Sequence, residues 1–427
     1  MSMKELLPSR EKILEEIFAS RTEFNKDKYI KRDSYEKYYQ KALRSPKCII
    51  VKGFSGSGKT WLTHNILINN DKKCEWINLS SIGSLNNGFN DFFKSQLQKY
   101  KTEISEDKKA GASAVFASGE LSTSNTYKLS YDYFYEYLKN NQHKYIIFDN
   151  LETIINNQPV IEALGAIITM IDDPKILKMD VRFIIIGTNS DIMSVFGKLP
   201  NIDTIRNRTQ DLPEIKGFTH SECSEYIMKN FKEIRIALEN PIEFINFVYK
   251  CTNGIPQNVC DLCKEICYEC IYNKKDRIDD IPTNTHPILK EAQSNWIRST
   301  FSSDYTKIFK LYTTNKAENA AYNNYILFML SELEEYGKIK TSFDVEYFKV
   351  KVSEYFTDNA KINTSISKKR IMEYLDKLSD TKNNNNILEK IAKDNYTIRD
   401  IKAVLCIRNI LYLDNSDNVL IQDMSDF

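Results

Sequence analysis

Residues 47–67 read KCIIVKGFSGSGKTWLTHNIL, and the architecture of the chain can be worked out from them. The apolar, β-branched run Cys48–Val51 predicts a strand, Gly53–Thr60 a glycine-rich loop, and the residues after it a helix. Glycine lets the backbone approach an anion closely, so that successive N–H groups point at its oxygens. A helix beginning near Lys59 adds the positive end of its dipole. This pattern predicts a phosphate-binding P-loop.

The loop supplies both backbone donors and two charged or polar side chains to a triphosphate. Lys59 is expected to reach the β and γ phosphates, and Thr60 to bind magnesium. A chance match in a surface loop is the alternative, which the flanking strand and helix disfavour. The predicted ligands of ATP and Mg²⁺ in this loop are Gly53, Ser55, Gly56, Ser57, Gly58, Lys59 and Thr60.

Composition limits the class of protein but not its partner. The chain has 427 residues, enough for two or three domains, and a net charge of +1, which neither suggests nor excludes nucleic acid. No apolar run is long enough to cross a membrane, and the first residues, MSMKELLPSREK, lack the apolar core of a signal peptide. Nine cysteines, an odd number, indicate reduced thiols. We expect a cytoplasmic protein without membrane contact.

Further strands follow the loop in the order of a parallel sheet. Strands are predicted at residues 74–79, 144–149, 181–187 and 211–215, with helical stretches between them. The buried run YIIFD ends in Asp149, which we expect to hold magnesium. The next buried run ends near Asn189, which is expected to orient the attacking water beside the γ-phosphate. Within the insertion 104–130, the small residues at 111–124 predict a loop or hairpin.

This order of motifs resembles the AAA+ ATPases over about residues 40–285. Within that class the chain is similar to the origin-recognition/Cdc6-like proteins and to the bacterial signalling ATPases of STAND type. The resemblance implies an α/β fold with a parallel sheet and a helical lid. The sequence Gly254-Ile255-Pro256-Gln257 matches the lid turn, so Pro256 is expected near the nucleotide. The resemblance also implies an oligomer in which Arg208, or failing that Arg206, reaches the γ-phosphate of a neighbouring subunit.

Two positions depart from the family's pattern. The residue after Asp149, usually a catalytic glutamate, is Asn150, which cannot accept a proton from water. Glu152 is the candidate substitute. The lid position that is often arginine is Gln257, which leaves one positive charge fewer on the phosphates. Both departures favour slow hydrolysis by a switch over the fast turnover of a motor.

Four cysteines, at positions 260, 263, 267 and 270, have a spacing that resembles a metal site. The surrounding segment Val259–Tyr272 has no glycine or proline and predicts one helix. At about 1.5 Å rise per residue, the outer two cysteines lie about 15 Å apart, too far for one tetrahedral metal. We therefore predict buried cysteines in the core of the lid. The four histidines form no motif.

A linker is predicted around Pro282 and Pro287. The C-terminal third beyond it is predicted to be mainly helical and, by the family resemblance, a winged-helix-like domain. Helices are expected before Gly337, at Val345–Phe356, and after Ser367, whose helix would bury Ile371, Tyr374, Leu375 and Leu378. A hairpin is expected from residues 410–413 and 419–421. The predicted domains are an N-terminal helical segment (1–40), an AAA+ domain (41–218), a lid (219–285) and the winged-helix-like domain (286–427).

Lys368, Lys369 and Arg370 fall in the first turn of the third helix, where the helix dipole disfavours cations. Such a run suits DNA phosphates, although a solvated surface explains it equally. The first hypothesis is an initiator-like or loader-like ATPase acting on DNA, in homo- or hetero-oligomers that bind ATP or ADP. The alternative is a STAND-type signalling or antiphage-defence ATPase whose C-terminal domain binds protein. A nucleotide-gated scaffold follows if Asn150 abolishes hydrolysis.

Overall fold

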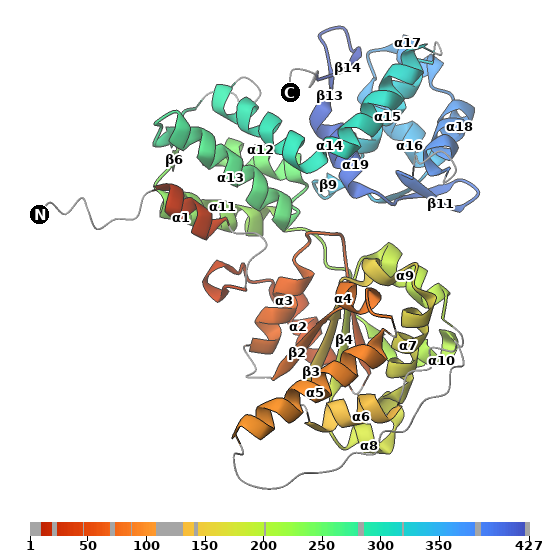
Figure 1. The fold of residues 1–427 in the computed structure, drawn as a ribbon. Coiled ribbons are helices and arrows are strands. Elements are labelled where there is room, and N and C mark those ends of the chain that lie inside the picture. Colours follow the sequence, from red (N-terminus) through yellow and green to blue (C-terminus); the bar gives the residue numbers. More distant parts are fainter. Residues whose placement is uncertain are drawn as a thin grey trace, which may run out of the picture. The chain divides into compact units, whose positions relative to one another are not determined.

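A computed structural model of the chain describes residues 10–18, 24–45, 47–68, 73–86, 88–107, 131–140, 144–199, 202–280, 286–317, 320–380 and 386–422. The loop predicted at 111–124 lies outside these residues. The chain forms two compact units, one spanning Glu23–Lys216 and one that joins α1 (Arg10–Ile17) to the residues from Gly217 onward (Figure 1). The N-terminal segment is therefore divided, with α1 in one unit and α2 (Asp33–Ala42) in the other.

A five-stranded sheet forms the centre of the first unit, in the order β2-β3-β4-β1-β5. Every neighbouring pair in it is parallel, as the sequence predicts. The strands are β1 (Cys48–Lys52), β2 (Cys74–Asn78), β3 (Tyr145–Asp149), β4 (Arg182–Gly187) and β5 (Thr209–Asp211). The last strand ends four residues earlier than predicted, and Ile215 instead makes an isolated parallel bridge to Gly53.

Side chains of the central strands alternate between two apolar cores, as the period of a strand requires. Ile50, Phe148 and Ile185 face one core, which is completed by the helices between β2 and β5. Ile49, Val51, Ile147, Ile184 and Ile186 face the other, which lies against α2 and α3 (Lys59–Ile68). Burial on both faces explains why these strands are continuous apolar runs in the sequence.

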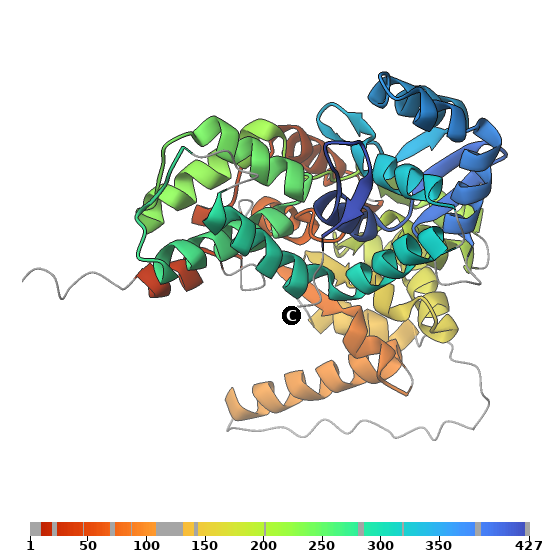
Figure 2. The same cartoon turned by 90° about the horizontal axis from the view of Figure 1, so that it is seen from above.

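The helices of the first core follow β2, β3 and β4 in the chain. Figure 2 shows α5 extending beyond the other elements of its unit. These elements are α4 (Leu79–Gly83), α5 (Phe89–Asp107), α6 (Tyr131–Asn140), the short helix η3 (Leu151–Ile154), α7 (Gln158–Thr169), η4 (Met170–Asp172), α8 (Pro174–Leu177), α9 (Asn189–Gly197) and α10 (Ile202–Asn207). A further short helix, η2 (Lys26–Lys28), precedes α2.

The second unit begins with the helices predicted as the lid. They are α11 (His220–Ile234), α12 (Pro241–Thr252) and α13 (Pro256–Tyr272), with the parallel pair β6 (Ala237–Leu238) and β7 (Arg277–Ile278). Helix α1 packs against α11 and α13. Its Glu15 accepts hydrogen bonds from Lys264, at 3.1 Å, and from Tyr268, so α1 is fastened to this unit by charge as well as by buried Leu14 and Ile17.

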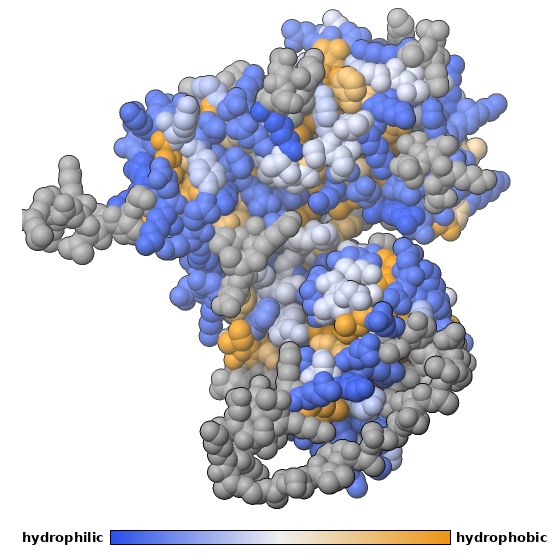
Figure 3. Space-filling view, in the orientation of Figure 1, coloured by the Kyte–Doolittle hydropathy of each residue, from blue (hydrophilic) through white to orange (hydrophobic). Residues whose placement is uncertain are grey.

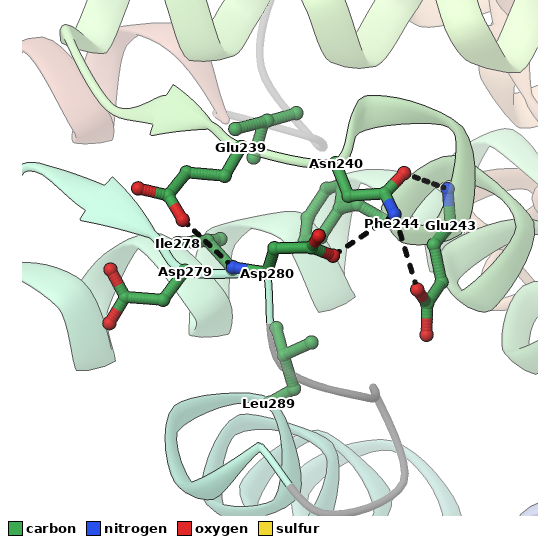
Figure 4. A pocket seen from close by; sticks show the side chains of 9 residues that line it. Glu239, Asn240, Glu243, Phe244, Ile278, Asp279, Asp280 and Leu289 are labelled. Carbon is green, nitrogen blue, oxygen red and sulfur yellow. Dashed lines mark hydrogen bonds between the residues drawn. The ribbon is translucent and has the colours of Figure 1, made fainter.

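The turn between β6 and α12 is closed by a polar network (Figure 4). The Oδ1 atom of Asn240 accepts from the N–H of Glu243 at 3.2 Å and caps α12, while its Nδ2 donates to Asp280 at 3.0 Å. Glu239 in turn accepts from the backbone N–H of Asp280 at 3.0 Å. These bonds use the polar groups of the small pocket in Figure 4 to hold the turn, which makes it a structural element of the lid.

The described residues of the C-terminal part form helices and three small antiparallel sheets. It comprises α14 (Pro287–Ala317), α15 (Tyr322–Glu332), β8 (Glu334–Glu335), β9 (Lys338–Ile339), β10 (Ser342–Asp344), α16 (Val345–Tyr355), α17 (Ala360–Ser365), α18 (Lys368–Ser379), β11 (Leu388–Ala392), β12 (Asn395–Ile398), α19 (Ile401–Ile410), β13 (Leu411–Leu413) and β14 (Val419–Ile421). One sheet has the order β10-β12-β11, and β13 pairs with β14 as predicted.

Several local predictions for this part are confirmed and two are wrong. Ser367 caps α18 by accepting from the N–H of Arg370, and the four predicted residues of α18 are buried. Gly337, however, is no helix end: with Tyr336 it forms the turn between β8 and β9, where both residues have positive φ (72° and 55°). Pro287 begins α14 and does not lie in a linker.

The cysteines of α13 are buried as predicted. Cys263, Cys267 and Cys270 are 0% exposed and Cys260 is 7% exposed. Burial raises the pKa of the Cys263 and Cys267 thiols well above the usual value, so both are neutral and poor metal ligands. Among the residues that the structure describes, no group of three or more histidine, cysteine, aspartate or glutamate side chains is arranged for a metal ion.

The visible face of both units is mainly hydrophilic, with scattered apolar residues (Figure 3). Tyr336 and Tyr272 are the most exposed large hydrophobic residues in the described part of the chain, at 97% and 84%. In the part of the chain that is described, no helix has both the length and the apolar character needed to span a bilayer.

The packing of α13 predicts how substitution of its cysteines affects stability. Cys263→Ser places a hydroxyl in an apolar site and should cost about 1–3 kcal/mol, more than Cys263→Ala, because the hydroxyl lacks a partner. Thermal unfolding measured with and without a strong zinc chelator tests this. The chelator should leave the melting temperature of the parent unchanged. A metal site would instead make the chelator destabilise the parent, and would make all four cysteine variants equally unstable and insensitive to the chelator.

Candidate nucleotide-binding site

The loop after β1 has the backbone that the glycines predict. Gly56 and Gly58 adopt φ of 76° and 87°, values that side chains with a Cβ rarely allow. Gly53 is required for a different reason, because a Cβ there would lie 2.3 Å from the carbonyl oxygen of Ile215. Helix α3 begins at Lys59 directly after the loop, so its unpaired N–H groups face the same region.

Lys59 lies folded against its own loop. Its ammonium donates to the carbonyl oxygens of Gly53 at 3.0 Å and Phe54 at 2.8 Å. Burial of this ammonium lowers the Lys59 pKa to about 8, and nearby carboxylates oppose the shift. Those carboxylates belong to Asp149, Glu152, Asp191 and Glu214. Four acidic side chains at or after the ends of β3, β4 and β5 therefore act electrostatically on this one ammonium group.

Thr60 and Asp149 lie together as the predicted magnesium pair. The Thr60 hydroxyl donates to Oδ2 of Asp149 at 3.1 Å. The other oxygen of Asp149 accepts from the N–H of Asn150 at 2.8 Å. Burial raises the Asp149 pKa, while these two hydrogen bonds and Lys59 act to lower it. A hydroxyl and a carboxylate at the carboxyl edge of a sheet are the oxygen ligands that Mg²⁺ prefers.

The tip of β3 has an unusual backbone at Asn150, the position where AAA+ ATPases usually carry glutamate. Asn150 is in the left-handed region, with φ 62° and ψ 48°. Its side chain donates to Oδ1 of Asn78, at the end of β2, at 2.9 Å. Glu152 follows in the short helix η3 and is exposed. Its charge acts on Lys59, which brings it into the neighbourhood of the loop.

Asn189 begins α9 two residues after the end of β4. Gly187 of β4 pairs with Lys52, the last residue of β1, so the segments that follow these two strands leave the sheet side by side. Asn189 is exposed, and its helix is capped by Thr188 and Asp191, whose side chains bond each other. The capping pair was not singled out in the sequence, although the spacing Thr-x-x-Asp carries the signal.

Arg208 lies at the opposite edge of the sheet from the phosphate loop. Its neighbour Thr209 pairs with Cys48, the first residue of β1, five residues before Gly53. At about 3.3 Å per residue, that separation is about 16 Å. Arg208 is bonded within its own chain to Asp172 at 2.6 Å and to the carbonyl of Thr204 at 2.9 Å. It cannot serve the phosphate loop of its own chain.

Pro256 lies in the second unit, at the first position of α13. The preceding turn contains Asn253 and Gly254, both with positive φ. The side chain of Gln257 donates to Asp261 at 3.1 Å, one turn along the same helix. The predicted lid turn is thus present as the N-terminus of a well-formed helix.

The described residues fit a magnesium-bound triphosphate. Positive-φ glycines, a helix N-terminus and Lys59 provide for the phosphates, and the Thr60–Asp149 pair provides for the metal. The hydroxyl of Ser57 is buried beneath the loop, 2.9 Å from the position that a Gly53 Cβ would take. Ser57 can therefore contribute its backbone, but its hydroxyl does not face an incoming phosphate.

The structure also identifies a residue of this region that sequence reasoning missed. Arg32 is 3% exposed and donates to the carbonyl oxygen of Ser57 at 2.9 Å. A single arginine in a charged helical segment carries no local signal of such a role. The two residues are 25 positions apart, so only the fold brings them together.

Comparison with solved structures gives matches along almost the whole chain. A Walker-type ATPase of Pyrococcus abyssi matches with a TM-score of 0.51 and 13% identity, over 92% of this chain and 99% of that one. The Aeropyrum pernix ORC2 protein in its ADP form matches at 0.47 and 11%, over 92% and 97%. The Thermotoga maritima RuvB Holliday junction branch migration motor matches at 0.40 and 13%, over 89% and 96%. No protein-family model and no curated protein matches the chain.

The match to the Pyrococcus abyssi ATPase is a likeness of fold. With the parallel order β2-β3-β4-β1-β5 and the loop after β1, it confirms an α/β fold of the AAA+ P-loop type. At 13% identity it says nothing about what this chain acts on.

The lowered pKa of Lys59 predicts that nucleotide binding depends on pH. Phosphates favour the charged ammonium, so affinity should be full below pH 8 and fall above it. At pH 9.5 the loss should approach about 30-fold, because the free protein has then lost most of this proton. Calorimetry in two buffers of different ionisation enthalpy should detect proton uptake on binding near pH 8.5.

Two variants control this experiment. Lys59→Met should lose nucleotide binding at every pH, because the cation is gone. Lys47→Met removes an exposed lysine just before β1 and should bind like the parent. Flat affinity between pH 7.5 and 9.5 without proton uptake would show that Lys59 does not carry the phosphate contact.

Proposed function

We propose that this protein is a cytoplasmic, magnesium-dependent ATP-binding switch that hydrolyses ATP slowly and only in assemblies of several subunits. The observation that carries the proposal is the convergence of Lys59, Thr60 and Asp149 at the end of β1 and β3. Nine free cysteines, eight of them buried, support a reducing compartment. Residues 41–218 would bind the nucleotide, and residues 219–285 would act as its lid.

Slow hydrolysis is supported by the residues at the tip of β3. Asn150 occupies the usual place of the base and its side chain is bonded to Asn78. Glu152 is then the nearest carboxylate along the chain that can accept a proton from water, and Asn189 the residue that would orient this water. Neither carries a hydrogen bond that fixes it toward the loop among the described residues, so the base is poorly preorganised.

Dependence on assembly is supported by the position of the arginines before β5. Arg208 lies about 16 Å from the loop of its own chain along β1, so it can act only on a neighbouring subunit. Arg208 would have to exchange Asp172 for a phosphate. Arg206 is exposed and has no ion pair within the described residues, which keeps it as the second candidate for the finger.

The C-terminal part supports a winged-helix-like domain within residues 286–427. The chain order α15, β10, α16, α18, β11, β12, with the sheet order β10-β12-β11, is the arrangement expected of that fold. In this proposal α18 is the contact helix and β11–β12 is the wing. The charges on α18 therefore bear on whether the partner is DNA or protein.

The charges of α18 give some support to each of these two partners. A DNA-acting, initiator-like role is supported by three cations in the first turn of α18. A protein partner, as in STAND-type signalling or antiphage defence, is supported by their pairing: Lys368 lies 3.0 Å from Glu346, and Lys369 lies 3.9 Å from Glu373. The span 320–422 also contains 15 basic and 15 acidic residues, so it has no net positive charge.

Turnover of variants tests the hydrolysis proposal. Glu152→Gln and Arg208→Ala should each lower ATP turnover at least tenfold while ATP affinity stays unchanged, because each group acts on the transition state. Arg206→Ala, at the end of α10 two residues before Arg208, is the matched variant. Parent turnover per subunit should rise with protein concentration.

Mixing variants tests action between subunits. Lys59→Met lacks the nucleotide contact and Arg208→Ala lacks the finger, so neither should turn over alone. A mixture should recover part of the parent activity, because each assembly then contains an intact loop beside an intact finger. If Glu152→Gln, Arg208→Ala and Arg206→Ala all hydrolyse like the parent, the assigned base and finger are wrong.

Binding to duplex DNA tests the role of the C-terminal part. If DNA is the partner, fluorescence anisotropy should detect binding that weakens as salt rises. Charge reversal of Lys368, Lys369 and Arg370 to Glu should reduce the slope of log affinity against log salt by the amount expected for about three phosphate contacts. The control reverses Lys229, Lys232 and Lys290, three exposed lysines of the same unit, and should leave binding nearly unchanged. No binding at low salt would discard DNA and leave the protein-partner hypothesis.

A further inference from the structure

The nucleotide-binding unit ends at Lys216, whose backbone is held by two side chains from the start of α2. A guanidinium nitrogen of Arg32 donates to the carbonyl oxygen of Lys216. The hydroxyl of Tyr35 accepts from the N–H of the same residue at 3.2 Å. The last residue of the unit is therefore fixed through both of its backbone polar groups, and the next residue, Gly217, already belongs to the other unit.

The same guanidinium reaches the phosphate loop. The Nη1 atom of Arg32 donates to the carbonyl oxygen of Ser57 at 2.9 Å, and the guanidinium lies 4.7 Å from the ring centre of Tyr35. A guanidinium is planar and rigid, so the two carbonyl oxygens that it holds keep a nearly fixed separation. Ser57 lies between Gly56 and Gly58, which both have positive φ and, lacking a Cβ, restrict rotation of the peptides around Ser57 less than other residues would.

A second contact ties the same two segments together. The N–H of Ile215 donates to the carbonyl of Lys52 at 2.7 Å, and its own carbonyl oxygen occupies the space that a Gly53 side chain would need. The exit segment therefore touches both the first residue of the loop and, through Arg32, its middle. A change in the loop cannot leave Lys216 unaffected.

On the far side of this link, the chain is fixed to the second unit. The carbonyl oxygen of Gly217 accepts from the ammonium of Lys338 at 2.8 Å. The N–H of Phe218 donates to the carbonyl of Gly254 at 2.6 Å, in the turn that precedes α13. One peptide bond thus joins Lys216, held by the nucleotide-binding unit, to Gly217, held by the second unit, which contains the predicted lid and is called the lid unit below.

We propose that Arg32 is a positioning residue that passes the nucleotide state of the loop to the point where the chain enters the lid unit. This inference rests on the proposed function, because it requires phosphate at the loop. Phosphate oxygens would accept hydrogen bonds from the N–H groups of the loop. The peptide bond between Ser57 and Gly58 carries one such N–H group, and its carbonyl oxygen is the atom that Arg32 holds. Reorientation of that peptide moves the guanidinium and, with it, Lys216.

The distance between the two units, measured by spin labels on the full chain, tests this inference. Labels at D203C and Y336C lie on exposed residues of the two units, and Cys74→Ser removes the one cysteine that is not buried. In the parent, Mg-ATP should change the distance distribution. Arg32→Met should still bind Mg-ATP, within about tenfold of the parent affinity by calorimetry, but should lose this change.

Two further variants separate positioning from simple stability. Tyr35→Phe removes the acceptor at Lys216 but leaves the bond between Arg32 and Ser57, so it should keep the distance change. Arg32→Lys keeps the charge without the planar fork, so it should recover at most part of the change. It replaces Arg32→Met in the experiment if the methionine variant fails to fold.

The outcomes distinguish this inference from the proposed function. A parent that does not bind Mg-ATP contradicts the proposed function itself. A parent that binds without any distance change, or an Arg32→Met variant that keeps the full change, overturns the inference. Loss of the change in Tyr35→Phe as complete as in Arg32→Met also overturns it, because anchoring of Lys216 alone would then explain the coupling.

Discussion

The contact between the backbones of Gly53 and Ile215 is the constraint on which the nucleotide-binding unit depends. The two residues form a parallel bridge, and the carbonyl oxygen of Ile215 fills the space of the missing Cβ. The phosphate loop can therefore turn away from β1 only at a glycine. The same contact brings the end of the unit against the loop, since Lys216 follows Ile215 directly. Loop geometry and the exit of the chain are thus set by one close approach.

Electrostatics at the loop follow from the parallel sheet. Because the carboxyl ends of β3, β4 and β5 meet at one edge, the acidic residues after them, Asp149, Asp191 and Glu214, act on the same cation, Lys59. A bare triphosphate would meet this negative field, and one lysine cannot balance it. A divalent cation held at Thr60 and Asp149 changes the balance. The arrangement therefore favours a nucleotide that arrives with its metal.

Sequence reasoning located the elements whose signals are local. Continuous apolar runs predicted the parallel strands, the glycines predicted the loop, and Ser367 predicted the start of α18. It failed where the decisive partner is distant in the chain: Arg32 meets Lys216 across 184 positions. It also failed at Gly337, because a glycine after an apolar helix signals a helix end and a hairpin turn equally well. The strand pair β11–β12 was missed because its first strand has four exposed residues and no apolar alternation.

The residue after Asp149 connects backbone conformation with chemistry. Asn150 lies in the left-handed region, where most residues cost about 1–2 kcal/mol more but asparagine is tolerated. Its side chain is bonded to Asn78, which itself caps α4 through the N–H of Ser80. A glutamate at this position would carry the backbone cost and break that link between β2 and β3. The path of this chain thus favours asparagine at the position where hydrolysis would need a base, which agrees with the slow turnover that we propose.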